Sequence, residues 1–302
     1  MRLAAATIII GCPLAAPALA QDVQPARDPL QTVSAIVTRP GSPSNGTATV
    51  SPSSVPQNMD RFDDPTSAFS ASVGTLYAVG NFGSDTNTSI WSSAIAARYR
   101  MGDLRLTASL PWMRIRSNAV IFTGIDSTPV LVAPSASAAL NTAKGSGDLT
   151  LGAAYTFAPE GAGLEVELSG RAKLNTATRS SKLSSGEKDY AAGVQITRLL
   201  GEFGPFVSAT YRVLGDTSNY RLRNGLAASA GTSLAVGSRS YLLASYHYSE
   251  RATDFVEDAH EVFAGAVTEI PNTRMRFSGF GTLGLSRGAA AASAGLALSR
   301  DF

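Results

Sequence analysis

The sequence predicts an all-β fold, a closed antiparallel transmembrane β-barrel of about twelve strands. Three observations predict it. The chain begins with a pattern typical of a secretory signal, and from about residue 68 it alternates apolar and polar residues with a period of two. It ends on a further alternating run, Leu296-Ala297-Leu298-Ser299-Arg300-Asp301-Phe302. An exported chain with strands that are apolar on just one of their two faces is typical of the bacterial outer membrane.

Residues 1–20 have the layout of a signal peptide. Arg2 supplies the positive charge, an apolar stretch follows, and Ala18-Leu19-Ala20 forms a cleavage site of small residues. Cys12, the only cysteine, falls inside this segment. The mature chain is therefore expected to lack disulfides and cysteine-based sites.

Residues 21–66 form a separate region with a different composition. Pro, Ser, Thr, Asn and Gln dominate it, as in Pro40-Gly41-Ser42-Pro43-Ser44-Asn45-Gly46, and no apolar periodicity survives. Such a composition predicts a disordered periplasmic segment. The barrel is then expected over residues 67–302.

The predicted strands are stretches in which apolar residues alternate with small or polar ones. In the third stretch, Leu104, Leu106 and Leu110 share one face, and Arg105 and Thr107 share the other. Because side chains alternate across a strand, one face can meet lipid while the other meets water. The stretches are 69–80, 89–100, 103–116, 147–158, 163–176, 188–200, 204–214, 221–235, 239–250, 259–270, 273–285 and 290–302.

The connections between these stretches agree with a barrel. Short ones such as Met101-Gly102 and Pro271-Asn272 alternate with longer ones, especially 117–146 and 177–187. This alternation is typical of tight periplasmic turns and larger outer loops. The sheet has to close, because each backbone N–H or C=O group that an edge strand leaves unpaired in hydrocarbon costs several kcal/mol.

The C-terminal residues predict the partners of the barrel. Phe302, Leu298 and Leu296 share the lipid-facing side, and a terminal aromatic residue of this kind is read by the barrel insertion machinery. That machinery and the outer-membrane lipids are therefore expected partners. Arg300 falls on the same face and has to reach the headgroups near the rim. Aromatic girdles at the interfaces are expected from Trp91, Tyr99, Trp112, Tyr155, Phe157, Tyr246 and Tyr248.

Composition argues against several other function classes. Only 16% of the residues are charged and the formal net charge is +2, which does not suggest nucleic-acid binding. Gly145-Ser146-Gly147-Asp148 lacks the Lys-Ser/Thr pair of a phosphate loop, so no nucleotide cofactor is expected. The two histidines are isolated from each other, so no metal site is expected either.

Three short motifs resemble those of a known barrel family. They are Ser109-Leu110-Pro111-Trp112, Gly145-Ser146-Gly147-Asp148-Leu149-Thr150-Leu151-Gly152-Ala153-Ala154-Tyr155, and Gly186-Glu187-Lys188-Asp189-Tyr190-Ala191-Ala192-Gly193. With them the chain resembles the outer-membrane proteins grouped as "MetA-pathway of phenol degradation", over roughly residues 70–302. The resemblance implies a β-barrel transporter of aromatic or other hydrophobic compounds. It implies no catalytic residues.

The candidate lumen residues are charged side chains on strand faces opposite the apolar rows. Facing lipid at mid-depth, each would cost roughly 2–4 kcal/mol, which favours an inward position. They form either a cation-lined passage for anionic or aromatic solutes or a structural network that fills a narrow barrel. The residues are Arg98, Arg100, Arg105, Glu165, Glu167, Arg171, Lys173, Arg212, Arg221, Arg223, His247, Arg274 and Arg276.

His247 and Ser249 open an enzymatic alternative. Residues two apart share one strand face, so His247 could activate the Ser249 hydroxyl, as in barrel lipid hydrolases, which this His-x-Ser pair resembles. An acyl chain has to be reached from lipid, however. Leu242, Tyr246 and Tyr248 make the better lipid face, which predicts that His247 and Ser249 point inward.

The sequence thus predicts a passive outer-membrane channel for small aromatic or hydrophobic solutes. The outer loop 117–146 is expected to gate the channel or bind the solute, because it is the longest loop and contains apolar residues such as Ile121 and Phe122. A lipid hydrolase and a structural or surface-display barrel remain the alternatives.

Overall fold

The computed structural model describes residues 68–82, 87–125, 129–133, 140–159, 161–178, 183–217 and 221–302. The predicted signal peptide and Pro/Ser-rich segment lie outside these residues. No helix within the described ranges is long and apolar enough to cross a membrane. The strands are β1 (Phe69–Gly80), β2 (Thr88–Met101), β3 (Leu104–Ser117), β4 (Val120–Thr123), β5 (Pro129–Ala133), β6 (Asn141–Ser146), β7 (Leu149–Phe157), β8 (Leu164–Leu174), β9 (Asp189–Arg198), β10 (Phe203–Val213), β11 (Gly225–Val236), β12 (Ser240–Ser249), β13 (Ala259–Ile270), β14 (Met275–Gly284) and β15 (Ala292–Asp301).

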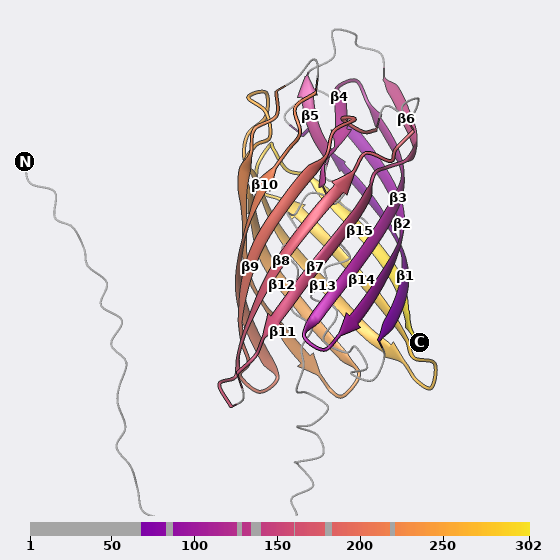
Figure 1. Ribbon diagram of the computed structural model, residues 1–302. Coiled ribbons are helices and arrows are strands. Elements are labelled where there is room, and N and C mark those ends of the chain that lie inside the picture. Colours follow the sequence, from indigo (N-terminus) through magenta and orange to yellow (C-terminus); the bar gives the residue numbers. More distant parts are fainter. Residues whose placement is uncertain are drawn as a thin grey trace, which may run out of the picture. The chain divides into compact units, whose positions relative to one another are not determined.

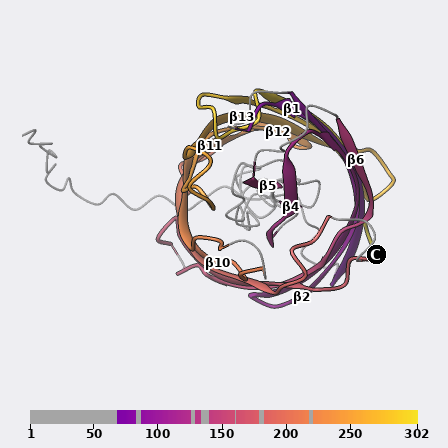
Figure 2. The same ribbon diagram turned by 90° about the horizontal axis from the view of Figure 1, so that it is seen from above.

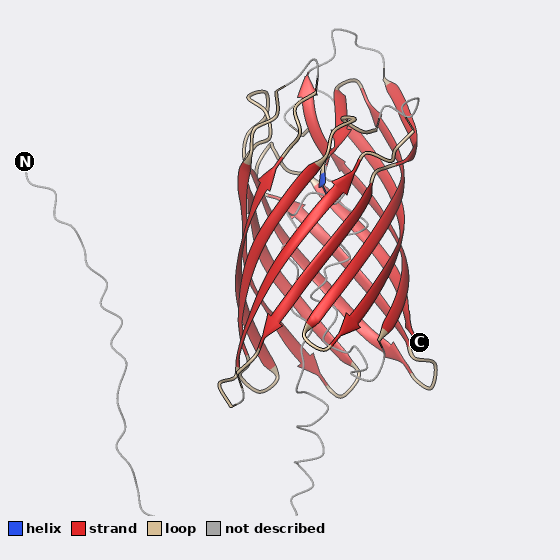
Figure 3. Ribbon diagram, viewed as in Figure 1, coloured by secondary structure: helices blue, strands red, loops and turns tan. Residues whose placement is uncertain are grey.

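The strands close into an antiparallel barrel (Figure 1). β1 pairs with β15 on one side and with β2 on the other, and β2–β3 pairing completes the ring. β3 pairs with β7 over its first half and with β6 over its second half, so β6 and β7 form one interrupted stave. The barrel therefore has twelve staves, and strands make up almost all of its wall (Figure 3).

The predicted strands agree closely with the observed ones. β1 and β13 have the predicted bounds, 69–80 and 259–270. The largest shift of a strand boundary is at β11, which begins at Gly225 instead of residue 221, and β14 also begins late, at Met275 instead of residue 273. Alternation predicts the strand interiors well because it reflects the two environments of the wall, and it predicts the ends less well because both environments there are water.

The outer face of the wall is apolar. Large apolar side chains at alternate positions are exposed there, as in Ile95, at 62%. Several aromatic residues predicted for the girdles share this face. An exposed apolar belt on a closed barrel is what a lipid environment requires. The exposed aromatic side chains include Trp91, Tyr99, Trp112, Tyr155, Phe157 and Tyr246.

One end of the barrel holds the C-terminus and the tight turns. The backbone N–H of Phe302 donates to the carbonyl oxygen of Phe69 at 3.0 Å, which joins the last strand to the first. Gly102 and Gly237 adopt φ values of +60° and +68° in two of these turns, a conformation that glycine reaches without strain. Both residues lie in connections that the sequence predicts to be short.

The long connection predicted at residues 117–146 contains regular structure. β6 extends the barrel wall, and β4 pairs with β5 in a separate antiparallel hairpin. Viewed along the barrel, this hairpin lies inside the ring of strands (Figure 2). The segment predicted as an outer loop therefore reaches into the mouth of the lumen.

Candidate functional site in the barrel lumen

The inward faces of the strands carry most of the predicted charged residues. Each lies at a position that alternates with the exposed apolar residues of its own strand, and several are almost fully buried. The inward residues are Arg98 and Arg100 of β2, Arg105 of β3, Glu165, Glu167, Arg171 and Lys173 of β8, Arg212 of β10, His247 of β12 and Arg276 of β14.

Three predicted lumen residues lie elsewhere. Arg221 and Arg223 are exposed in the connection that precedes β11, and Arg274 is exposed in the turn that precedes β14. Arg223 forms an ion pair with Asp254 at 2.6 Å on the surface. These corrections have one cause, because both strands begin later than their alternation suggests and leave the arginines outside the wall.

Two of the inward arginines form ion pairs with carboxylates of other strands on the inner face of the wall. The Nη2 atom of Arg105 donates to both carboxylate oxygens of Glu167, at 3.0 and 2.9 Å. The Nη2 atom of Arg276 donates to Asp301 at 2.7 Å. All four side chains are at least nine-tenths buried. Arg105 and Arg276 are thus neutralised by wall carboxylates, as the structural-network alternative expects.

Lys173 is the centre of a buried polar cluster. Its Nζ atom lies 3.1 Å from a carboxylate oxygen of Asp189 and 3.4 Å from one of Asp148. It also donates to the carbonyl oxygen of Thr123 and the hydroxyl of Ser185. A buried ammonium group is tolerated only with such compensation. The cluster therefore ties strand β8 to the hairpin, because Thr123 is the last residue of β4.

The hairpin is held by the backbone as well. The amide N–H and the hydroxyl of Thr123 both donate to the carbonyl oxygen of Leu183, at 2.7 and 2.6 Å. Ser184, the β-bridge partner of Thr123, donates to Asp148 at 2.5 Å. Asp148 also accepts the backbone N–H groups of Thr176 and Ala177, which follow β8. The hairpin and the segment at Leu183 and Ser184 thus support each other.

Two buried apolar clusters, which share Phe280 and are together called the apolar strip, lie on the inner face of the wall between β10 and β3. Near the mouth, Ile121 of the hairpin packs in a buried cluster with wall residues of β1, β2 and β3. A second buried cluster lies on β10, β12 and β13. Phe280 of β14 packs against both clusters, and its ring lies 5.8 Å from that of Phe263. The first cluster includes Leu76, Ala78, Phe82, Ile90, Met113, Ile115, Leu183 and Ala290, and the second consists of Phe206, Tyr241, Leu243, Phe263 and Val267.

Gly295 makes room for the aromatic residue that joins the two clusters. It is paired with Phe280 across β14 and β15, and a Cβ atom at this position would lie 2.5 Å from the Phe280 ring. A glycine covered by a cross-strand aromatic ring is a recurrent arrangement in sheets. It keeps the Phe280 ring close to the wall.

His247 and Ser249 both face the lumen, as their alternation predicts, but each has a different polar neighbour. The Nε2 atom of His247 bonds the hydroxyl of Ser245 at 2.7 Å. The hydroxyl of Ser249 accepts from Nη2 of Arg212 at 2.6 Å. Neither of these hydrogen bonds is the nucleophile–base contact that the hydrolase alternative requires.

Sequence reasoning missed the acidic partners and the apolar strip. Asp148 and Asp189 lie in the very motifs that carry the family resemblance, yet their role as counter-ions of Lys173 became visible only in the fold. An inward lysine at a strand end was the available signal, because it demands nearby carboxylates. The strip had no sequence signal, since Phe280 and Ile121 belong to segments far apart in the chain.

Comparison with known proteins identifies the fold. No family model matches the sequence, and no curated protein matches it either. Among solved structures, an outer membrane channel from Pseudomonas putida F1 is similar over 79% of this chain and 96% of its own, with a TM-score of 0.63 and 14% identity. A FadL homologue from Pseudomonas aeruginosa and the monoaromatic hydrocarbon channel CymD have TM-scores of 0.45 and 0.44. They cover 88% and 89% of this chain and 95% and 97% of their own, at 11% identity each. The chain therefore has the fold of an outer-membrane β-barrel, and its apolar belt assigns it to that membrane.

Proposed function

We propose that this protein is an outer-membrane channel for the passive uptake of small aromatic or hydrophobic solutes. The apolar strip through Phe280 carries the proposal. A lumen built for ions or sugars offers polar side chains and water throughout, whereas the inner face of this wall carries two apolar clusters joined by Phe280. The fold shared with an outer membrane channel supports the same conclusion.

The strip would carry solute by successive hydrophobic contacts. Apolar burial stabilises a bound solute by about 25 cal/mol per Å² of surface, and a stacked aromatic pair adds about 0.5–1.5 kcal/mol. Contacts of this size attract an aromatic ring without holding it, as conduction requires. In this proposal, the inward arginines Arg98 and Arg100 of β2, a strand that also carries part of the strip, add cation–π attraction for rings in transit.

The hairpin β4–β5 is proposed to gate the mouth. It lies inside the ring of strands, and its Ile121 covers wall residues at the outer end of the strip. Its anchors are the hydrogen bonds of Thr123 and the Lys173 cluster. Solute would enter when these hydrogen bonds break and the hairpin moves aside. Such movement is expected because the bonds are few and the hairpin belongs to a long connection.

The experiment is a comparison of solute flux through proteoliposomes. Phe280→Ser should lower the uptake of a small aromatic hydrocarbon several-fold and leave the swelling rate in a small sugar unchanged. Leu283→Ser, on the lipid face of the same strand, is the matched control and should change neither rate. Equal aromatic flux in the wild type and in Phe280→Ser, or sugar flux that exceeds aromatic flux in the wild type, would overturn the proposal.

A further inference from the structure

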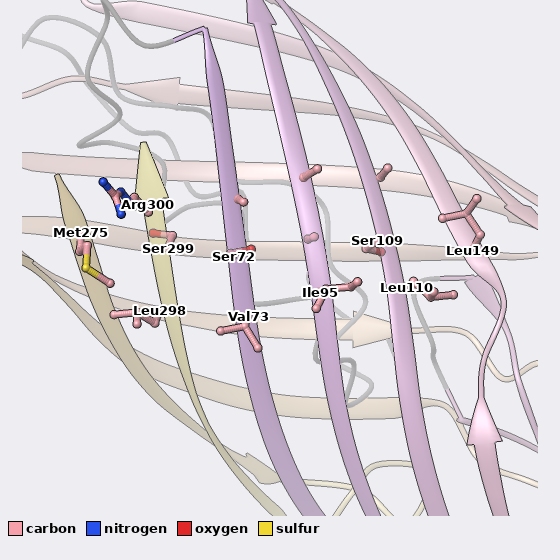
Figure 4. A pocket seen from close by; sticks show the side chains of 14 residues that line it. Ser72, Val73, Ile95, Ser109, Leu110, Leu149, Met275, Leu298, Ser299 and Arg300 are labelled. Atoms are coloured by element: carbon pink, nitrogen blue, oxygen red, sulfur yellow. The ribbon is translucent and has the colours of Figure 1, made fainter. Parts of the chain in front are cut away.

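A groove opens on the outer face of the barrel where β1, β2 and β3 lie beside β14 and β15. Its volume is about 560 Å³ and its lining is almost entirely apolar (Figure 4). Most of the lining side chains, among them Val73, Ile95 and Leu298, belong to the lipid-facing rows. The groove is therefore a feature of the membrane-facing surface and not of the lumen.

Three alanines form the floor of this groove. Ala71 pairs with Ala97, and Ala97 pairs with Ala108, so they make one row across three strands. Larger residues flank the row on both sides. Val73, Ile95 and Leu110 form the next row toward the middle of the membrane, and Phe69, Tyr99 and Leu106 form the next row toward the rim. The row spans about 10 Å, because neighbouring strands are about 4.8 Å apart, and each flanking row lies about 7 Å away along the strands, which leaves room for a hydrocarbon chain.

A single cation stands at one end of the alanine row. Arg300 pairs with Ala71, is exposed, and lies with its guanidinium 5.3 Å from the ring of Phe302. Within the described ranges, no carboxylate forms an ion pair with it. Its neighbour Asp301 points to the other face of the sheet, where it binds Arg276. An arginine in this position attracts a negative group from the membrane side.

We propose that the groove binds an anionic glycerophospholipid of the periplasmic leaflet. One acyl chain lies along Ala71, Ala97 and Ala108, and the headgroup phosphate accepts hydrogen bonds from Arg300. The position of Arg300, two residues before the C-terminal Phe302, places the guanidinium at the rim, where phosphates lie. Apolar area and electrostatic attraction act together in lipid binding of this kind.

The wall is continuous beneath the alanine row. β15, β1, β2 and β3 are paired without interruption over the residues that line it, including Val73 with Leu298 and Ile95 with Leu110. A chain that lies along the alanine row thus remains outside the lumen. The lipid site does not depend on the proposed transport function.

Native mass spectrometry of the full-length purified barrel tests the proposal. The probes are a palmitoyl-oleoyl phosphatidylglycerol, the phosphatidylcholine with the same chains, and glycerol phosphate without chains. The wild type should retain the anionic lipid about five-fold better than the zwitterionic one, the factor expected for one arginine near an anionic group. Glycerol phosphate should not be retained, because it has no chain to fill the groove.

Two variants with matched controls separate the headgroup from the chain. Arg300→Gln should reduce the anionic preference to about one, whereas Arg274→Gln, at an exposed arginine of the same rim, should keep it. Ala97→Leu fills the groove and should reduce retention of both lipids, whereas Ala264→Leu on the lipid face of β13 should not. An unchanged preference in Arg300→Gln, retention of glycerol phosphate alone, or a dimer that Ala97→Leu dissociates would each overturn the proposal.

Discussion

The ammonium group of Lys173 lies 3.1 Å from a carboxylate oxygen of Asp189, and both side chains are 1% exposed. Lys173 also approaches Asp148, so its charge compensates two carboxylates at the end of the barrel where the hairpin enters. Removal of the cation would leave both carboxylates buried without their counter-ion. This arrangement makes Lys173 the most informative position for a stability measurement.

Lys173→Met is expected to destabilise the barrel by about 3–5 kcal/mol, because a buried ion pair that loses one partner leaves an uncompensated charge. Urea unfolding in detergent micelles measures the change. Arg223→Met is the control, since Arg223 and Asp254 form an exposed pair, for which about 0–1 kcal/mol is expected. A similar loss in both variants would show that the cluster does not stabilise the fold.

Glu261 should respond in the opposite way to Glu167. Glu261 is fully buried, and among the described residues neither of its carboxylate oxygens has a hydrogen-bond partner. Replacement by leucine removes an unsatisfied polar group, so Glu261→Leu is expected to stabilise the barrel by about 1–2 kcal/mol. Glu167→Leu leaves the buried guanidinium of Arg105 without its carboxylate partner and is therefore expected to destabilise the barrel. Urea midpoints of the two variants should therefore move in opposite directions.

Two strand glycines predict a contrast in steric tolerance. A Cβ atom on Gly231 would lie 2.5 Å from the backbone oxygen of Ala244, whereas one on Gly170 would have no neighbour within 4 Å. Gly231→Ala is expected to cost about 1–3 kcal/mol, because the neighbouring strand has to shift. Gly170→Ala should be neutral or stabilise by up to about 1 kcal/mol. Equal unfolding midpoints for the two variants would contradict this account.

A reversible cross-link tests the proposed gate. Thr123 and Ser184 are β-bridge partners, a spacing that a disulfide can span, so Thr123→Cys with Ser184→Cys should fix the hairpin when oxidised. Aromatic flux is expected to fall several-fold and to recover with reductant. Ser208→Cys with Ser229→Cys, which links two neighbouring wall strands, should leave flux unchanged in both redox states. Full flux in the oxidised hairpin variant would rule out hairpin movement as the gate.

The terminal aromatic residue is proposed to be the handle for membrane insertion. Phe302 is 57% exposed and contacts Phe69 at a ring distance of 5.7 Å. Deletion of Phe302 is expected to reduce the amount of heat-modifiable barrel in outer-membrane extracts several-fold, while Phe302→Tyr should preserve it. Refolding of the purified deletion variant in detergent distinguishes loss of recognition from loss of stability, because only the latter would lower its urea midpoint.

The sequence alone determined the strands of the wall and the direction of most side chains. Leu104, Leu106 and Arg105 illustrate why: a strand between lipid and lumen changes environment at every residue, so a period of two records both faces. The same reasoning predicted the inward position of His247 and the outward position of Arg300. It failed for Arg221, Arg223 and Arg274, because the alternation begins by chance before the first paired residue of β11 and of β14.

Only the tertiary structure decided what the lumen contains. The hairpin β4–β5 turns inward from a segment that has no period linking it to the wall, and Lys173 meets Asp148 and Asp189 through three separate parts of the chain. Phe280 likewise joins two clusters that come from distant parts of the sequence, the first mainly from β1 to β4 and the second from β10, β12 and β13. Local alternation fixes which way a residue points, but contacts across a lumen depend on closure of the sheet, which no local pattern encodes.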